Sequence, residues 1–229
     1  MRRRVSSPQK LVEFREFHTP SSGIFFRAKQ RLWSEKSAFQ QIDIIETDSF
    51  GRVLFLDGLV QTTEKDEFFY HEMLVHPALV SHPAAAEVLI IGGGDGGTLK
   101  EVLRHPVKKA ILVEIDRRVV EVSRKFFPWL APALADERVE LVIADGNAFI
   151  QKSTRRFDVI LIDSSDPVGP STVLHQKEFY SRLKAHLKPR GIIAGQAGSP
   201  LYHAASLREK KAFMQKMFRF CLYYLGPVP

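Results

Sequence analysis

Four acidic residues each follow a short apolar run of the kind that forms a buried strand. They are Asp95, Glu114, Asp145 and Asp163. The runs alternate with segments of helical periodicity, which predicts parallel strands joined by helices. Because the carboxyl ends of parallel strands meet at one edge of a sheet, where ligands bind, we expect these acids to lie close together. Such carboxylates repel each other unless a cation lies among them, so the pattern favours a cationic ligand, either a polyamine or a metal ion. For one acid alone, a helix N-cap would be the simpler explanation.

The stretch 87–98, EVLIIGGGDGGT, has the pattern of a nucleotide-binding turn between a strand and a helix. Thr98 and Glu101 have the spacing of a capping box, which predicts that the helix begins at Thr98. Asp95 within the turn would repel a pyrophosphate, so it favours a ligand with a positive group. Glu114, about 20 residues after the turn, is placed to accept hydrogen bonds from ribose hydroxyls. A sulfonium nucleoside that carries an ammonium group fits both observations.

Three blocks of the chain resemble, in the same order, the polyamine aminopropyltransferases, the family typified by spermidine synthase. They are FGRVLFLDGLVQTTEKDEFFYHEML at 50–74, VLIIGGGDGGTLKEV at 88–102 and DVILIDSSDPVGP at 158–170. The resemblance runs from about residue 17 to residue 229. It implies transfer of the aminopropyl group of decarboxylated S-adenosylmethionine to putrescine, which gives spermidine and 5′-methylthioadenosine.

The implied reaction requires a base, and it requires neither a metal ion nor another cofactor. The leaving group is a neutral thioether, which departs without protonation. The attacking alkylamine has a pKa of about 10.4, like lysine, and must lose a proton before it attacks. A carboxylate can accept that proton, and the resemblance assigns this role to Asp163. His71 and His76 are five residues apart, whereas the zinc-protease motif has histidines four apart, so no metal site is expected.

The resemblance also implies which residues hold the two substrates. The residues expected to bind the amine are Tyr70, His71, Asp95, Asp163 and Asp166. The residues expected to bind the nucleoside are Gln40, Gln61, Gly92, Gly94, Asp95, Glu114, Asp145, Gly146 and Pro170. The stretch 164–175, a long loop with Gly and Pro, is expected to form a mobile lid over the site.

The elements that must position these residues form two domains. Strand-like runs between residues 23 and 63, separated by turn signals, predict a small antiparallel β domain. A helix over 68–80 leads into a Rossmann-like, doubly wound parallel sheet of the class I methyltransferase type. The expected strands lie at 88–91, 110–115, 139–143, 157–163 and 191–196, and the expected helices at 98–104, 117–127, 147–153, 176–187 and 204–220. We therefore expect domains at 1–75 and 76–229.

Both ends of the chain have their own predictions. Residues 1–16 are polar and are expected to be a loose lead-in. Residues 223–229 look like the start of another strand, where the resembled family continues with a final strand pair. The second domain is therefore expected to lack its last strands.

Composition excludes several classes of protein. The net charge is +7 and the sequence pI is about 9.5, but basic residues alternate with acidic ones, which favours solvated faces over a nucleic-acid surface. The one cysteine, Cys221, permits no internal disulfide and is expected to be a small core residue. No run approaches the roughly 18 apolar residues of a membrane span, and the N-terminus lacks the apolar core of a secretory signal. A cytoplasmic protein is expected.

Three alternative functions stay open at this point. The acceptor could be agmatine, cadaverine or spermidine. The chain could be a methyltransferase that uses intact S-adenosylmethionine, or a nucleoside-binding protein without activity. Exposed hairpin edges in the β domain favour self-association, and the resemblance implies a homodimer or homotetramer.

Overall fold

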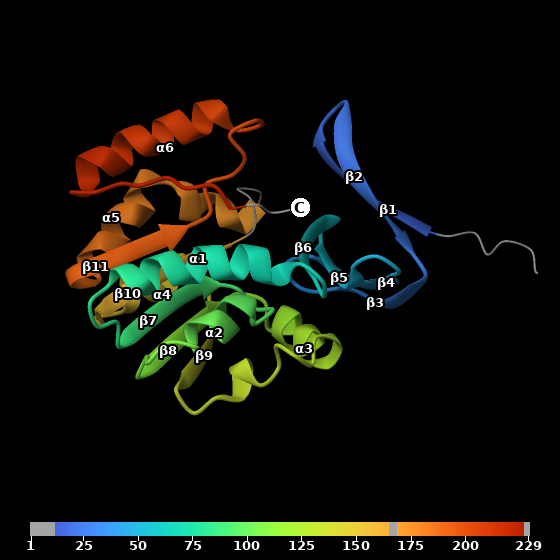
Figure 1. Ribbon diagram of the computed structural model, residues 1–229, viewed down its shortest axis with the longest axis horizontal. Coiled ribbons are helices and arrows are strands. Elements are labelled where there is room, and N and C mark those ends of the chain that lie inside the picture. The colour runs from blue at the N-terminus through green and yellow to red at the C-terminus, as the bar shows by residue number, and fades with distance from the viewer. Residues whose placement is uncertain (1–11, 165–168, 227–229) are drawn as a thin grey trace, which may run out of the picture. The chain divides into compact units, whose positions relative to one another are not determined.

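The computed structural model describes residues 12–164 and 169–226, which divide into two compact units (Figure 1). The N-terminal unit comprises Met1–Lys36 and Gln40–Lys65, and the second unit comprises Ser37–Phe39 and Asp66–Pro229. The domain limit that we predicted, between residues 75 and 76, falls inside helix α1 (Glu67–Ser81) and stays a prediction.

The N-terminal unit is built of antiparallel strands, as expected. Strands β1 and β2 form one sheet, and β3, β4, β5 and β6 form another in that order. Their bounds are β1 (Val12–Thr19), β2 (Ser22–Ala28), β3 (Gln30–Lys36), β4 (Gln41–Thr47), β5 (Gly51–Leu56) and β6 (Leu59–Thr63). The unit has a core of its own, in which Phe14 and Phe26 pack against buried Phe55.

The prediction of a loose lead-in through residue 16 is wrong from Val12 onward, where β1 begins. The segment VEFREFHT pairs with β2 in antiparallel register, and the ring of Phe14 lies 5.1 Å from that of Phe55, measured between centroids. The strand was missed because its charged residues, on a segment without a buried residue, made it look like a polar lead-in, although alternation of apolar and polar residues favours a strand. Residues 1–11 lie outside the described residues.

The second unit contains a five-stranded parallel sheet in the order β11-β10-β7-β8-β9. The strands are β7 (Glu87–Gly92), β8 (Lys109–Glu114), β9 (Val139–Ile143), β10 (Phe157–Asp163) and β11 (Leu187–Gly195). Chain order reverses between β7 and β10, which are neighbours although three strand connections separate them along the sequence. Such a reversal leaves a crevice beyond the carboxyl ends of the two strands, where open α/β sheets bind ligands.

Helices cover both faces of this sheet, which confirms the doubly wound fold (Figure 1). The remaining helices are α2 (Gly97–Val102), α3 (Arg117–Phe126), α4 (Gly146–Lys152), α5 (Lys177–Ala185) and α6 (Ala204–Met217), with short 3-10 helices η1 (Ala133–Ala135) and η2 (Gly169–His175). Helices α1, α2 and α3 pack with Val88 and Ile90 on one face of β7. Helices α4 and α5 pack with Leu89 and Ile91 on the other. Both faces are therefore buried, which explains the continuous apolar runs in the sequence.

Three local predictions are wrong. Helix α2 is preceded by Gly96 as its N-cap, with φ of +90° and no side-chain cap, so Thr98 is not the cap of a capping box. Tyr223 to Gly226 form no strand, although the last residues, 227–229, lie outside the described ones. Cys221 is half-buried after α6 and so is not a core residue.

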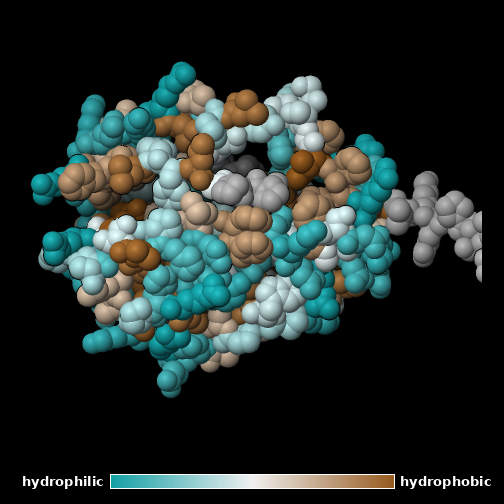
Figure 2. All heavy atoms as spheres, viewed as in Figure 1, coloured by the Kyte–Doolittle hydropathy of each residue, from teal (hydrophilic) through white to brown (hydrophobic). Residues whose placement is uncertain are grey.

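Among the described residues, no helix is long and apolar enough to cross a membrane. On the face shown in Figure 2, hydrophilic residues dominate and hydrophobic ones form small separate groups. Scattered apolar side chains of this kind are normal on a protein surface.

Candidate active site

The turn after β7 and the end of β10 lie side by side at the carboxyl edge of the sheet. Asp163, the last residue of β10, is in register with Gly92, the last residue of β7. Asp95 follows in the turn, where its Oδ1 accepts a hydrogen bond of 3.0 Å from the backbone N–H of Gly97. The order of the strands thus brings together two acids that are 68 residues apart in the sequence.

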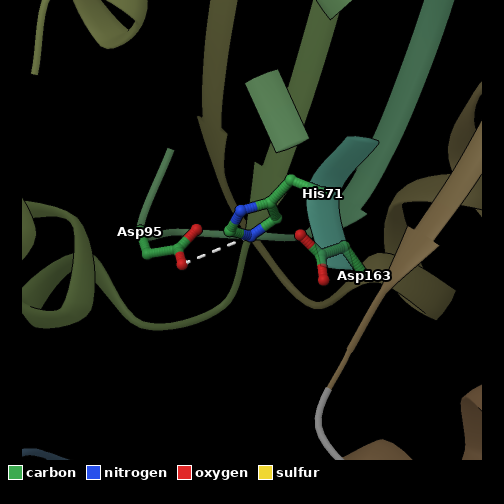
Figure 3. A group of neighbouring side chains, drawn as sticks. All are labelled: His71, Asp95 and Asp163. Atoms are coloured by element: carbon green, nitrogen blue, oxygen red, sulfur yellow. Dashed lines mark ion pairs between the residues drawn. The ribbon is translucent and has the colours of Figure 1, made fainter. Parts of the chain in front are cut away.

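Helix α1 brings two further predicted residues to these acids. The hydroxyl of Tyr70 donates to Oδ1 of Asp163 at 2.9 Å. The Nε2 atom of His71 lies 3.6 Å from Oδ2 of Asp95. Figure 3 shows the imidazole ring between the two carboxylates, with Asp95 on one side and Asp163 on the other. One cluster, at the carboxyl edge of the sheet, is therefore formed by Tyr70, His71, Asp95 and Asp163.

On the side of the ring away from Asp95, His71 contacts a carboxylate that sequence analysis missed, that of Glu67. Its Nδ1 atom lies 2.6 Å from Oε2 of Glu67, and Oε1 of Glu67 lies 2.5 Å from Nζ of Lys100. The side chains of His71 and Glu67 are 3% and 5% exposed. Glu67 is four residues before His71 on the same helix, a spacing that brings two side chains together and is the signal that could have revealed it.

The pKa of His71 is raised to about 9, so the ring is protonated at neutral pH. Burial alone would lower this pKa, because it disfavours the charged ring. The charge of Asp95, the hydrogen bond to Glu67 and the charge of Asp163 together outweigh that effect.

The pKa of Asp163 is raised above that of an ordinary aspartate. Withdrawal from water is the main cause, and the charge of Asp95 adds to it. The positive charge of His71 and the hydrogen bond from Tyr70 act in the opposite direction. A carboxylate with a raised pKa is a stronger base. The role of Asp163 as the catalytic base stays a prediction at this point.

Glu114 lies at the end of β8 and is 7% exposed. One carboxylate oxygen accepts from the backbone N–H of Gly94 at 3.1 Å, and the other from that of Asp116 at 2.9 Å. Burial raises its pKa to about 7, although these two hydrogen bonds lower it. Each oxygen keeps a lone pair that could accept a ribose hydroxyl, and the role of Glu114 in binding the ribose stays a prediction.

Asp145 does not join the cluster through any contact that we observe. It caps α4, where its Oδ1 accepts from the backbone N–H of Ala148 at 2.7 Å, and its side chain is exposed. Gly146, the first residue of α4, packs closely against Ile91 of β7. The simple N-cap explanation therefore describes Asp145, and a contact of Asp145 or Gly146 with adenine stays a prediction.

The structure gives no contact with this cluster for the remaining predicted residues that it describes. Gln40 and Gln61 belong to the N-terminal unit, where the side-chain amide of Gln61 donates to the carbonyl of Leu59 at 3.2 Å. Asp166 lies outside the described residues, and Pro170 is in η2. The predicted lid, 164–175, contains η2 in its second half, and its mobility stays a prediction.

Within the described part of the chain, two groups of side chains bring possible metal-binding atoms within 4.8 Å of one another. In the first, His71, Asp95 and Asp163, the protonated ring of His71 has no free lone pair, so an ammonium group fits better than a metal ion. In the second, Nη1 of Arg104 already lies 2.9 Å from Glu101 and 3.5 Å from Glu72.

Comparisons with known proteins cover nearly the whole chain. A family model described as "Spermine/spermidine synthase domain" matches residues 67–229, and one described as "Spermidine synthase tetramerisation domain" matches residues 12–64. The chain is 43% identical over 217 residues to a polyamine aminopropyltransferase of Shouchella clausii, covering 94% of this chain and 79% of that protein. It is 47% identical over 207 residues to one of Leptospira biflexa, covering 90% of this chain and 74% of that protein.

Two solved structures have the same fold. A spermidine synthase in complex with the transition state analogue AdoDATO matches with a TM-score of 0.89 and 40% identity, over 93% of this chain and 74% of that one. The spermidine synthase of Thermotoga maritima matches with a TM-score of 0.87 and 40% identity, over 93% of this chain and 73% of that one.

The close approach of α2 to His71 yields a first prediction. A Cβ atom on Gly97 would overlap the imidazole ring, which is buried and held by Glu67. Gly97→Ala should therefore lower the free energy of unfolding by about 1–3 kcal/mol, measured by urea denaturation. At the control position Gly226→Ala, the new Cβ would meet Met73 at an ordinary 3.4 Å, and little change is expected. Equal stability of the two variants would contradict the position that we describe for the His71 ring beside Gly97.

Proposed function

Because the chain belongs to the spermine/spermidine synthase family, we propose that it transfers the aminopropyl group of decarboxylated S-adenosylmethionine to putrescine, giving spermidine and 5′-methylthioadenosine. The family membership confirms the resemblance seen in the three sequence blocks, and the chain is an aminopropyltransferase. The observation that supports the specific reaction is the cluster of Tyr70, His71, Asp95 and Asp163 at the switch point of the sheet.

The chemistry follows from what each group can do. The nitrogen of the acceptor attacks the methylene carbon that is bonded to the sulfonium, and the new carbon–nitrogen bond forms as the carbon–sulfur bond breaks. Both electrons of that bond go to sulfur, which leaves as a neutral thioether. The proton on the attacking nitrogen passes to Asp163, whose raised pKa makes it an effective acceptor. Tyr70 holds one oxygen of Asp163, which orients the other toward the amine.

The remaining rate acceleration would come from holding the two substrates in the orientation that the reaction requires. Holding the nitrogen in line with the carbon–sulfur bond is worth up to about 7–11 kcal/mol. Asp95, fixed in the turn by Gly97, would bind the amino group of the donor. Glu114 would hold the ribose of the donor. A related spermidine synthase, 40% identical, forms a complex with the transition state analogue AdoDATO, which supports binding of a small-molecule substrate by this fold. No cofactor is needed in this scheme, because the donor is a co-substrate.

We also propose that the N-terminal unit mediates self-association. This unit matches the family's tetramerisation domain over residues 12–64. Light scattering at micromolar concentration should therefore give the mass of a homodimer or homotetramer. The mass of a monomer would contradict the proposal.

The proposed reaction is tested by the release of 5′-methylthioadenosine, measured by mass spectrometry. The protein would be incubated with decarboxylated S-adenosylmethionine and, separately, with putrescine, cadaverine, agmatine and spermidine. Fastest release with putrescine is expected. Fastest release with another amine would replace putrescine as the acceptor, and no release with any amine would contradict the proposed activity.

The role of Asp163 leads to a second prediction. Asp163→Asn removes the proton acceptor but keeps the shape of the side chain, so turnover should fall by about 10²–10⁴-fold. Binding of 5′-methylthioadenosine, measured by calorimetry, should change little, because the nucleoside is held mainly by other residues. A matched control is Asp48→Asn, which alters an exposed carboxylate of the N-terminal unit. Wild-type turnover in Asp163→Asn would show that another group is the base.

The hydrogen bond from Tyr70 predicts a change in pH dependence. This bond stabilises the ionised form of Asp163, so its loss in Tyr70→Phe raises the pKa of Asp163 further. A base must be ionised to act, and the acid limb of the kcat profile should therefore move to higher pH. A bond to a charged group is worth about 1.5–3 kcal/mol, which corresponds to roughly one to two pH units. A uniform loss of kcat with an unmoved acid limb would contradict this account.

A further inference from the structure

We propose that Glu67 and Lys100 are positioning residues that hold His71 as a built-in cation between Asp95 and Asp163, so that the site admits one ammonium group and takes the attacking nitrogen as free amine. The proposal rests on the proposed function, because it assigns a task to these residues in the same site. Neither Glu67 nor Lys100 was among the residues that sequence analysis predicted.

The contacts of the ring fix its charge. Nδ1 of His71 lies 2.6 Å from Oε2 of Glu67, and Nε2 lies 3.6 Å from Oδ2 of Asp95. A neutral imidazole carries a proton on one nitrogen and would turn the lone pair of the other toward a carboxylate. Only the imidazolium form faces both carboxylates with N–H groups, so this placement selects the charged ring.

Glu67 is suited to hold the ring because its own position is fixed. It is the first residue of α1, and its second oxygen accepts from Nζ of Lys100, on α2, at 2.5 Å. Lys100 therefore links two packed helices through the carboxylate that supports His71. A functional group held by rigid elements and an outer layer of hydrogen bonds keeps one geometry throughout the reaction.

The charges around His71 come from each element that packs against it. They are Glu67 on α1, Asp95 in the turn after β7 and Asp163 on β10, with the hydroxyl of Tyr70 beside them. Lys100 offsets Glu67. Its second partner, Glu101 at 3.2 Å, is offset in turn by Arg104 at 2.9 Å. The two carboxylates and the imidazolium that remain leave one net negative charge, which one ammonium group neutralises.

This charge count has a consequence for the acceptor amine. The donor's amino group would supply the one ammonium. A second ammonium in the same place would meet the positive charge of His71, and among the described residues of the cluster no further carboxylate is left to balance it. His71 therefore disfavours the protonated form of the attacking nitrogen, which assists its loss of a proton to Asp163.

The test compares Glu67→Gln with wild type in the full chain, by two measurements. The first is the nitrogen chemical shifts of the His71 ring, followed by NMR against pH without substrates. In the wild type the ring should stay charged up to a pH of about 9. In Glu67→Gln the ring should become neutral at a pH at least one unit lower. The carboxylate that stabilises the charged ring is then missing, and burial favours the neutral form.

The second measurement is the pH profile of turnover with the amine that gives fastest release. Glu67→Gln should lower kcat by about 10–100-fold, the range found when the outer partner of a metal-bound histidine is removed. The acid limb should move to higher pH, while KM for the amine changes less than kcat. Lys100→Arg, which keeps the positive charge, should retain most of the activity.

The matched control is Glu72→Gln, on the same helix next to His71. The side chain of Glu72 is 40% exposed and pairs with Arg104 at 3.5 Å. This variant should behave like wild type in both measurements. If Glu67→Gln does not fold, Lys100→Met provides the same comparison, because it removes the ammonium that orients Glu67.

Three results would overturn the proposal. They are a neutral His71 ring in the wild type at pH 7.5, a titration of His71 that Glu67→Gln leaves unchanged, and a loss of kcat without movement of the acid limb. Failure of the proposed function is distinguishable from all three. In that case no amine supports release of 5′-methylthioadenosine, while the NMR titration still decides the charge of His71.

Discussion

Carboxylates that meet at one edge of a sheet must be neutralised, and this constraint organises the second unit of the protein. The neighbouring strands β7 and β10 bring Asp95 and Asp163 to the same crevice, where burial makes their mutual repulsion costly. The ring of His71, which extends from α1, lies between the two carboxylates and offsets their repulsion. Helix α2 leaves room for the ring at Gly97, where any side chain would collide with it. In the proposed reaction, the ammonium group of the donor would complete the charge balance.

Sequence predicted the acids at the edge because their placement follows from local rules. Each apolar run ends where a strand ends, and parallel strands place those ends together. Asp95 and Asp163 converge because β7 and β10 are neighbours, which was not evident from the runs themselves. Asp145 follows β9, the outermost strand on the other side, and caps α4. The sequence pattern could not distinguish these cases, because it does not contain the order of strands in the sheet.

Two features could not be read from the sequence because they depend on packing and on backbone geometry. The pair of Glu67 and Lys100 joins residues 33 positions apart, and it exists only because α1 packs on α2. The start of α2 was misplaced because Gly96, in the left-handed region, ends the turn two residues before Thr98. A capping box and a glycine turn compete for the same segment, and here the glycine determined where the helix begins.

The central claim is that this edge of the sheet selects a ligand with an ammonium group and without a carboxylate. Calorimetric titration of the protein with decarboxylated and with intact S-adenosylmethionine tests it most directly, because the two ligands differ by one carboxylate. The account predicts at least tenfold tighter binding of the decarboxylated form, a difference of about 1.4 kcal/mol or more, and a smaller difference in Asp95→Asn. Equal or tighter binding of intact S-adenosylmethionine would contradict the account.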